Sequence, residues 1–282
     1  MNKIPRFHHY PVYWLMLGVL WFIRHLPLSW ALSLGRAAGD LAYFCDRRRR
    51  ARARENIMAA LGYTRDESDR LIHRVFRHFG MLVMEIVLAW DLINEENWHD
   101  HIRFHPRHLQ MLKDTGGKAI LVSAHLGNWE CLGAVLSLAK IRAASIVRPI
   151  DNPLVNRFLS ALREKHGGRL IQKKGAIREA AAYLNQGWGV AILLDQDAGR
   201  HGVFVDFFGR PASTSRAAAL LARMTGAPII SGVAYRVKDF TYQVELDETP
   251  VVVPRTDDQE RDIREATALV TTRLEAHIRA HP

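Results

Sequence analysis

The chain has 282 residues, of which 48% are hydrophobic. This is enough for a large α/β domain with its own core, and it excludes global disorder. The formal net charge of +10 favours an acidic partner: nucleic acid, an anionic membrane, a phosphorylated substrate or an acidic carrier protein. The two cysteines, Cys45 and Cys131, form no CxxC motif and no Cys/His cluster. They argue against a zinc ribbon or a disulfide scaffold and fit a reducing compartment.

The N-terminus carries the apolar run PVYWLMLGVLWFI, residues 11–23. It is shorter than the roughly 20 apolar residues that cross a bilayer core. No small-x-small cleavage site follows closely, which argues against a signal peptide. Its aromatic residues suit a membrane interface: Tyr10, Tyr13, Trp14, Trp21 and Trp30. We predict an uncleaved anchor or interfacial helix, which could extend through LPLSWALSLG as a hairpin in one leaflet. The alternative is a buried helix packed on the domain.

An arginine cluster follows in DRRRRARARENI, with six arginines from Arg47 to Arg54. A basic segment beside an apolar, Trp-rich one is typical of contact with anionic lipid head groups. Nucleic acid is the competing explanation, but the apolar neighbour favours lipid. We therefore expect residues 1–60 to form a helical, membrane-anchoring segment and residues 61–282 to form the α/β domain.

Residues 66–91 repeat apolar side chains at helical spacing, and the preceding TRDESDR supplies N-cap candidates. This pattern predicts one helix or a broken pair, with no chemistry of its own. The apolar positions are Leu71, Val75, Phe79, Leu82 and Ile86.

From Lys118 onward, short apolar runs alternate with helical patterns. The strand candidates are KAILVSA, AASIVRP, GRLIQ, GVAILLD, APIISGVAYR and FTYQVELDETP. The helix candidates are NPLVNRFLSALREKHG, AIREAAAYLNQG, SRAAALLARMTG and the C-terminal residues 257–282. Alternating strands and helices predict βαβ units. The expected fold class is α/β, with a mainly parallel central sheet flanked by helices and a helical N-terminal extension.

The segment SAHLGNWE, residues 123–130, follows the first of these strands. In open α/β sheets, ligands bind beyond the carboxyl ends of the strands, and this segment places His125 there. Gly127 and Asn128 predict a turn, and Glu130 would lie in the first turns of the next helix. We expect Glu130 to hydrogen-bond the imidazole and fix its tautomer, which suits His125 as a general base.

No internal nucleophile is evident beside this pair. Ser123 is expected to point to the other side of the strand, and Cys131 is most simply a packed hydrophobe. G-x-S-x-G and HExxH are both absent, so the base would act on an external acceptor and we expect no metal. By spacing alone, a purely structural histidine is equally consistent with the pattern.

SAHLGNWE resembles the H-x4-D/E signature of glycerolipid acyltransferases. Further segments resemble the branch that makes lipid A, the late lauroyl and myristoyl acyltransferases. These are VRPIDNPLVNRF, LLDQDAG and GVFVDFFGRPASTS, followed by the proline-containing GAPIISG. The resemblance covers residues from Lys118 to Val237, and the apolar N-terminus with its arginine cluster fits as well.

The resemblance implies transfer of a fatty acyl chain to a hydroxyl of a membrane lipid, most simply a lipid A precursor. The donor would be an acyl carrier protein or coenzyme A thioester, with no further cofactor. Expected partners are an acyl carrier protein, anionic membrane lipid and the lipid acceptor, with no nucleic acid; a monomer is the simplest state. The enzyme would sit on the cytoplasmic face of the inner membrane. Lysophospholipids, ornithine-type lipids and other glycolipids stay open as acceptors.

Further residues are candidates for substrate binding. Arg148 follows a strand and could bind a phosphate, or form a salt bridge to Asp151 or Glu130. Asp195 and Asp197 follow GVAILL and could shape a loop or bind the acceptor. Asn128, in the signature itself, is also assigned to substrate binding.

The segment FVDFFG, residues 204–209, is apolar for the loop that we expect there. Phe204, Phe207 and Phe208, with Gly209, could line an acyl tunnel, or could simply be core.

Two other function classes compete with the transferase. A non-enzymatic basic protein would bind membrane or nucleic acid through the arginine cluster, without using His125. A hydrolase would use the same pair on water, which the apolar residues near the site disfavour.

Overall fold

The computed structural model describes residues 4–165, 167–173 and 175–282, and it divides into two compact units, residues 4–94 and 95–281. The sequence placed the boundary after residue 60. The structure divides later because helix α4, Arg65–Leu92, packs with the helices before it and belongs to the N-terminal unit.

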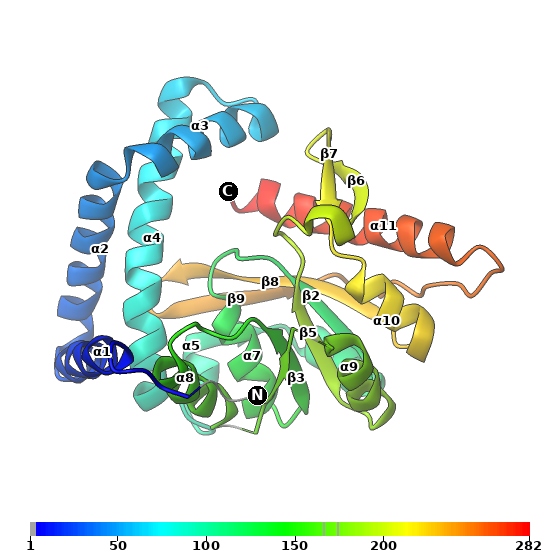
Figure 1. The fold of residues 1–282 in the computed structure, drawn as a ribbon, viewed down its shortest axis with the longest axis horizontal. Coiled ribbons are helices and arrows are strands. Elements are labelled where there is room, and N and C mark those ends of the chain that lie inside the picture. Colours follow the sequence, from blue (N-terminus) through cyan, green and yellow to red (C-terminus); the bar gives the residue numbers. More distant parts are fainter. Residues whose placement is uncertain (1–3, 166, 174) are drawn as a thin grey trace. The chain divides into compact units, whose positions relative to one another are not determined.

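The N-terminal unit is made of helices (Figure 1). They are α1 (His9–Arg24), α2 (Leu28–Cys45), α3 (Arg47–Leu61) and α4 (Arg65–Leu92). The predicted cap is confirmed: the Thr64 hydroxyl accepts a hydrogen bond from the Glu67 N–H, and the Glu67 carboxylate accepts one from the Thr64 N–H. Beyond this capping box α4 runs as one continuous helix, not a broken pair.

Helices α2 and α4 approach closely through glycines (Figure 1). A Cβ on Gly80 would lie 2.0 Å from the Gly35 carbonyl oxygen, and a Cβ on Gly39 would lie 2.5 Å from the Phe76 carbonyl oxygen. Gly35 and Gly39 are four residues apart and therefore share one face of α2. Small residues at this spacing let two helix backbones touch.

The other face of α2 and most of α1 carry exposed apolar side chains. On α1 these include Trp14, Leu15 and Trp21; on α2 they are Trp30, Leu34, Leu41 and Phe44. Between Tyr10 and Ile23 the sequence has no charged residue. Across the described residues, none of the helices combines the length and the apolarity needed to span a bilayer.

The second unit confirms the α/β prediction. Its seven-stranded sheet has the order β1-β9-β8-β2-β5-β3-β4, and only the β8–β9 pair is antiparallel. The strands are β1 (Ile102–Phe104), β2 (Ile120–Ser123), β3 (Ala143–Val147), β4 (Arg169–Gln172), β5 (Gly189–Leu193), β8 (Ile229–Lys238) and β9 (Thr241–Leu246). The short β1, with α5 (Trp98–His101) and α6 (Pro106–Asp114) around it, was not predicted.

Helices cover both faces of the sheet because successive strands are added first toward one edge of the sheet and then back toward its centre. The chain runs outward from β2 through α7 (Trp129–Leu138) to β3, and through α8 (Pro153–Glu164) to β4. It then returns through α9 (Ala176–Asn185) to β5. Right-handed crossovers in opposite directions place their helices on opposite faces. The main core lies between the strands and α9, α10 (Ala217–Thr225) and α11 (Gln259–Ala280).

A β-hairpin replaces the loop expected at residues 204–209. Strands β6 (Val203–Phe207) and β7 (Arg210–Thr214) pair antiparallel, after the short 3-10 helix η1 (Gly199–His201). Phe208 and Gly209 form the turn with φ of 56° and 72°. Two left-handed residues make the turn that matches the twist of a hairpin. The sequence concealed it, because a phenylalanine rarely takes this conformation.

Candidate active site

His125 and Asp195 meet at the carboxyl rim of the sheet. Strands β2 and β5 are parallel neighbours, with Ser123 paired to Leu193. His125 and Asp195 each lie two residues beyond that pair, so the register brings them side by side. The Asp195 carboxylate accepts two hydrogen bonds, from the His125 backbone N–H at 2.9 Å and from its Nδ1 at 2.8 Å. This leaves Nε2 as the ring nitrogen that can accept a proton.

The surroundings make this imidazole more basic. The hydrogen bond that the imidazole donates to Asp195 raises the pKa of His125, partial burial opposes the rise, and the charges of Asp195 and Glu130 add to it. The Trp129 ring packs edge-on against the imidazole, with ring centroids 4.8 Å apart. The His125 side chain is partly exposed, so it is fixed on one edge and open to a ligand on another.

The turn after His125 is fixed by the neighbouring strand. Gly127 has a φ of 58°, and a Cβ there would lie 1.9 Å from the Ala234 carbonyl oxygen of β8. Only glycine fits such a close backbone approach. The same carbonyl accepts a hydrogen bond of 2.7 Å from the Asn128 N–H. The signature glycine therefore locks the loop against β8.

Asn128 caps helix α7, which corrects the expected substrate contact. Its side-chain oxygen accepts a hydrogen bond from the Cys131 N–H at 3.2 Å. The residue is only 1% exposed and so is not available to a substrate. Ser123 and Cys131 are also buried, in line with an external acceptor rather than a protein nucleophile.

Glu130 does not play the expected part toward His125. Within the described chain its carboxylate binds the guanidinium of Arg163 on α8, with Arg163 Nε 3.1 Å from Oε2 and Nη2 bonded to Oε1. The predicted hydrogen bond to the imidazole is wrong: Asp195 makes it instead. Glu130 still acts on the imidazole through its charge. Helix α8 supplies a cation that the sequence analysis did not assign to the site.

Two other predicted residues lie at the rim. Arg148 directly follows β3, is exposed, and forms no ion pair with any residue that the structure describes. The alternative of a salt bridge to Glu130 is therefore not realised, since Glu130 is paired with Arg163. Asp197 shapes the loop after β5, where its carboxylate accepts a hydrogen bond of 2.8 Å from the Gly199 N–H.

Phe207, Phe208 and Gly209 form the tip of the hairpin, which crosses α11 and points away from the sheet (Figure 1). The Phe208 N–H donates to Glu275 of α11 at 2.6 Å, and the Arg279 guanidinium lies over the Phe208 ring at 4.7 Å. These contacts are with α11, not with the rim that carries His125. These contacts give the hairpin tip a structural role on α11, and its part in an acyl tunnel stays a prediction.

The sheet is mainly parallel, a carboxylate holds the imidazole at its carboxyl rim, and the described residues place no exposed nucleophile beside it. This arrangement is typical of an enzyme that uses a general base on an external substrate. The comparison with known proteins makes this specific. The chain belongs to the family of bacterial lipid A biosynthesis acyltransferases, which it matches over residues 1–282. It is therefore an acyltransferase.

Individual relatives differ in what their names say they transfer and modify. The chain is 26% identical to the lipid A biosynthesis palmitoleoyltransferase of Escherichia coli (strain K12), over 99% of this chain and 91% of the relative. It is 28% identical to the lipid A biosynthesis lauroyltransferase of the same organism, over 85% and 80%. It is also 26% identical to the phosphatidylinositol mannoside acyltransferase of Mycobacterium tuberculosis (strain ATCC 25618 / H37Rv), over 62% and 54%.

Proposed function

We propose that this acyltransferase moves a fatty acyl chain from a carrier thioester to a hydroxyl group of a lipid A precursor, with His125 as general base. The observation that carries the proposal is the pair of hydrogen bonds that the backbone N–H and the ring Nδ1 of His125 donate to the Asp195 carboxylate. It fixes both the place and the tautomer of the imidazole, and it leaves Nε2 open as a base.

The reaction then needs no covalent intermediate on the protein. The acceptor hydroxyl gives its proton to His125 Nε2 while its oxygen attacks the thioester carbonyl carbon. The tetrahedral intermediate collapses as the carbon–sulfur bond breaks. The leaving sulfur takes the proton from Nε2, which restores the neutral imidazole. Asp195 stays ionised throughout and stabilises the imidazolium.

Glu130 and Arg163 have a supporting part in this scheme. Their bidentate ion pair ties the start of α7 to α8 beside the base. Glu130 adds a second negative charge that favours protonated His125. Arg163 is a positive group suited to the oxyanion of the intermediate. Arg148 and Asp197 are assigned to binding of the polar acceptor, where an unpaired cation suits a phosphate group.

The donor and acceptor follow from the family and from charge. An acyl carrier protein suits a chain with net charge +10, with acyl coenzyme A as the second candidate and no metal or further cofactor required. Lipid A is favoured by the family match over the whole chain. Phosphatidylinositol mannosides are the second candidate, because relatives of that name also match.

The N-terminal unit suits attachment to one leaflet on the cytoplasmic face of the inner membrane. The exposed aromatic and aliphatic side chains of α1 and α2 would enter the head-group and acyl boundary. Arg47, Arg48 and Arg52 on α3 form no ion pairs with described residues and would bind anionic lipid.

The proposal is tested with the purified protein in detergent. Acyl carrier protein and coenzyme A thioesters of several chain lengths are offered with lipid A precursors, phosphatidylinositol mannosides and lysophospholipids, and products are identified by mass spectrometry. His125→Ala should remove acyl transfer to every acceptor while the circular dichroism spectrum is unchanged.

Transfer by His125→Ala at the rate of the unaltered enzyme would refute the proposal. Release of free fatty acid without any acceptor would indicate a hydrolase instead. Cys131→Ala serves as a matched control, because Cys131 lies near the base but is buried.

A further inference from the structure

The hollow between α9 and α10 is the feature of interest away from His125. It has a volume of about 450 Å³ and opens to solvent. We call it the α9–α10 hollow. Its floor is apolar, formed by Ala176, Ile177, Ala181 and Met224. Met224 is 51% exposed, which is high for an apolar side chain in this unit.

Cations flank this floor. Lys173 and Arg178 both line the hollow, are exposed, and form no ion pair with any residue within the described ranges. On the α10 side the Arg255 guanidinium donates to the Met224 carbonyl oxygen at 3.2 Å. Among the residues that the structure describes, no acidic side chain lines the hollow. The hollow therefore has an apolar centre bordered by positively charged side chains.

The charge of Arg178 does not stabilise helix α9. The residue lies in the first turn of α9, which begins at Ala176. The partial positive charge of a helix N-terminus repels a cation in that turn. The first turn also carries Glu179, and Arg178 forms no ion pair with a described residue, so its charge is available to a ligand with negative charge.

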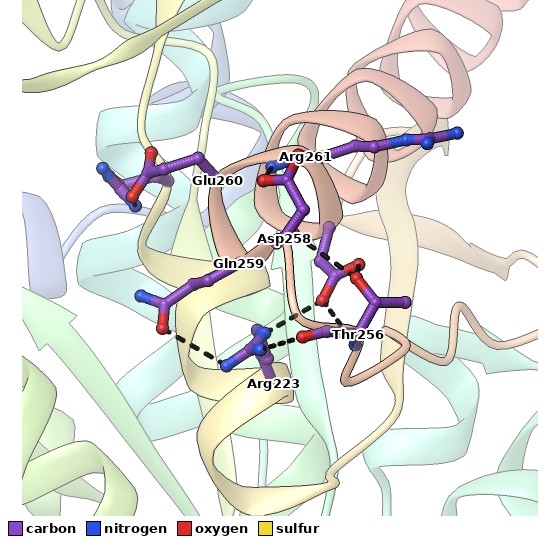
Figure 2. A network of polar contacts seen from close by, with 8 residues as sticks. Arg223, Thr256, Asp258, Gln259, Glu260 and Arg261 are labelled. Atoms are coloured by element: carbon purple, nitrogen blue, oxygen red, sulfur yellow. Dashed lines mark hydrogen bonds and ion pairs between the residues drawn. The ribbon is translucent and has the colours of Figure 1, made fainter.

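The α10 side of the hollow is held rigidly (Figure 2). Arg223, next to Met224, donates to Asp262 at 3.0 Å, to the Thr256 carbonyl oxygen at 2.7 Å and to Gln259 at 3.3 Å. The Thr256 hydroxyl donates a hydrogen bond of 2.7 Å to Asp262 and lowers the pKa of that carboxyl. The hydrogen bond and charge of Arg223 lower the pKa of Asp262 as well. This network ties the end of α10 to the start of α11 and presents Met224 on a fixed backbone.

The Lys173 end of the hollow lies at the carboxyl edge of the sheet, whereas Met224 precedes Thr225, whose carbonyl oxygen accepts a hydrogen bond from Lys118 before β2. Lys173 follows β4, and its N–H donates to the carbonyl oxygen of Val147 at the end of β3. Since β4 is parallel to β3, β5 and β2, this is the same rim that carries His125. The strand order β2-β5-β3-β4 puts Lys173 about 14 Å from His125, at three strand spacings.

We propose that the α9–α10 hollow is the docking site for the acidic acyl carrier protein, which rests on the acyl transfer proposed above. An acidic amphipathic helix would place its carboxylates on Lys173, Arg178 and Arg255 and its apolar side chains on Met224 and Ile177. The long flexible prosthetic arm of the carrier would then extend along the rim to His125. A site for free phosphate would instead need buried polar donors, and this floor is apolar.

The test is a binding measurement that does not depend on turnover. Fluorescently labelled holo acyl carrier protein is titrated with the full-length enzyme in detergent at low and at 0.5 M salt. The double variant Lys173→Glu with Arg178→Glu should weaken binding at least tenfold at low salt and remove most of its salt dependence. Arg264 on α11 is exposed and forms no ion pair with the described part of the chain, so Arg264→Glu should change binding by less than twofold.

Kinetics separate this site from the catalytic one. With the carrier-bound donor, the double variant should raise KM with little change in kcat. With acyl-pantetheine or acyl coenzyme A its kcat/KM should equal that of the unaltered enzyme. His125→Ala should bind the carrier normally. Carrier binding can therefore still be measured and interpreted if the proposed reaction is not observed.

Three outcomes would overturn the docking site. One is carrier binding that the double variant leaves unchanged. Another is an equal loss with the coenzyme A donor, which would indicate a simple anion site. The third is a loss of binding to anionic vesicles with unaltered carrier binding, which would indicate a membrane contact. Arg178→Glu should also keep or raise the melting temperature, because it replaces a cation in the first turn of a helix with an anion.

Discussion

The two units of this protein place apolar residues in opposite ways. In the α/β unit, apolar strands and helix faces are buried and polar groups stand at the rim, where Asp195 holds His125. In the N-terminal unit the tightest contact is made by glycines, and large apolar side chains face outward. The first arrangement is what water requires of a fold, whereas the second suits a helix pair in contact with lipid. The predictions below test this contrast.

The largest expected effect is at the rim. Asp195→Asn should lower kcat for acyl transfer by about 10²- to 10⁴-fold, because the amide neither fixes the required tautomer as firmly nor stabilises the imidazolium. KM for the acceptor should change little. Steady-state kinetics with a carrier-bound donor measures the effect.

Asp197→Asn is the matched control for kcat, because Asp197 is assigned to acceptor binding and its loss should act on KM. Asp197 lies two residues further along the same loop, and its contact is with the Gly199 N–H. Equal losses in the two variants would mean that the loop, and not the hydrogen bond to His125, matters.

The next effect compares close-contact glycines in the two units. Gly127→Ala would place a methyl group against β8, and Gly80→Ala would place one against α2. Each should cost about 1–3 kcal/mol in unfolding free energy, as overpacking does. Gly127→Ala should also lower activity by moving His125, though less than Asp195→Asn does, whereas Gly80→Ala should spare activity in detergent.

Two open glycines provide the controls for chemical and thermal unfolding. Gly133 in α7 and Gly18 in α1 have nothing within 4 Å of an added Cβ. Their alanine variants should be neutral or stabilising by up to about 1 kcal/mol, because alanine favours the helix. If all four variants were destabilised equally, close backbone contact would not be the reason for the loss in unfolding free energy.

How far the sequence predicted the site depends on sequence distance. The strands, α4 with its capping box, and the place of His125 followed from local patterns. The partner of His125 lies 70 residues away, and only the adjacency of β2 and β5 brings Asp195 to it. Spacing along one chain does not reveal strand order, so Glu130, five residues away, was the natural but incorrect choice. The hairpin tip was missed for a different reason, since Phe208 occupies a turn position that glycine or asparagine normally takes.

A smaller effect is expected for the outward face of the N-terminal unit. Trp14→Glu combined with Trp30→Glu should reduce partitioning into anionic vesicles by at least about tenfold, or 1.4 kcal/mol. The activity of this double variant on detergent-dispersed substrate should be unchanged. Vesicle flotation gives the measurement.

Val252→Glu is the control in the other unit, because Val252 is 75% exposed but isolated from α1 and α2 in sequence. If Val252→Glu reduced flotation as much as the double tryptophan variant, the apolar face of α1 and α2 would not be the membrane contact.

The smallest effect concerns pH and separates the two carboxylates near His125. A general base must be neutral, so kcat/KM should rise with pH through the pKa of His125, which lies above its ordinary value of about 6.5. The hydrogen bond that His125 donates to Asp195 is the main cause of this rise in pKa, and the charge of Glu130 is the smallest of the contributions that raise it. Asp195→Asn should therefore move the acid limb of the profile to lower pH, and Glu130→Gln should move it in the same direction by less. The same sign applies to stability: the contribution from protonated His125 is complete below the unfolded pKa and is lost as pH rises through the folded pKa. A larger displacement of the limb by Glu130→Gln than by Asp195→Asn would restore Glu130 as the direct partner of the base.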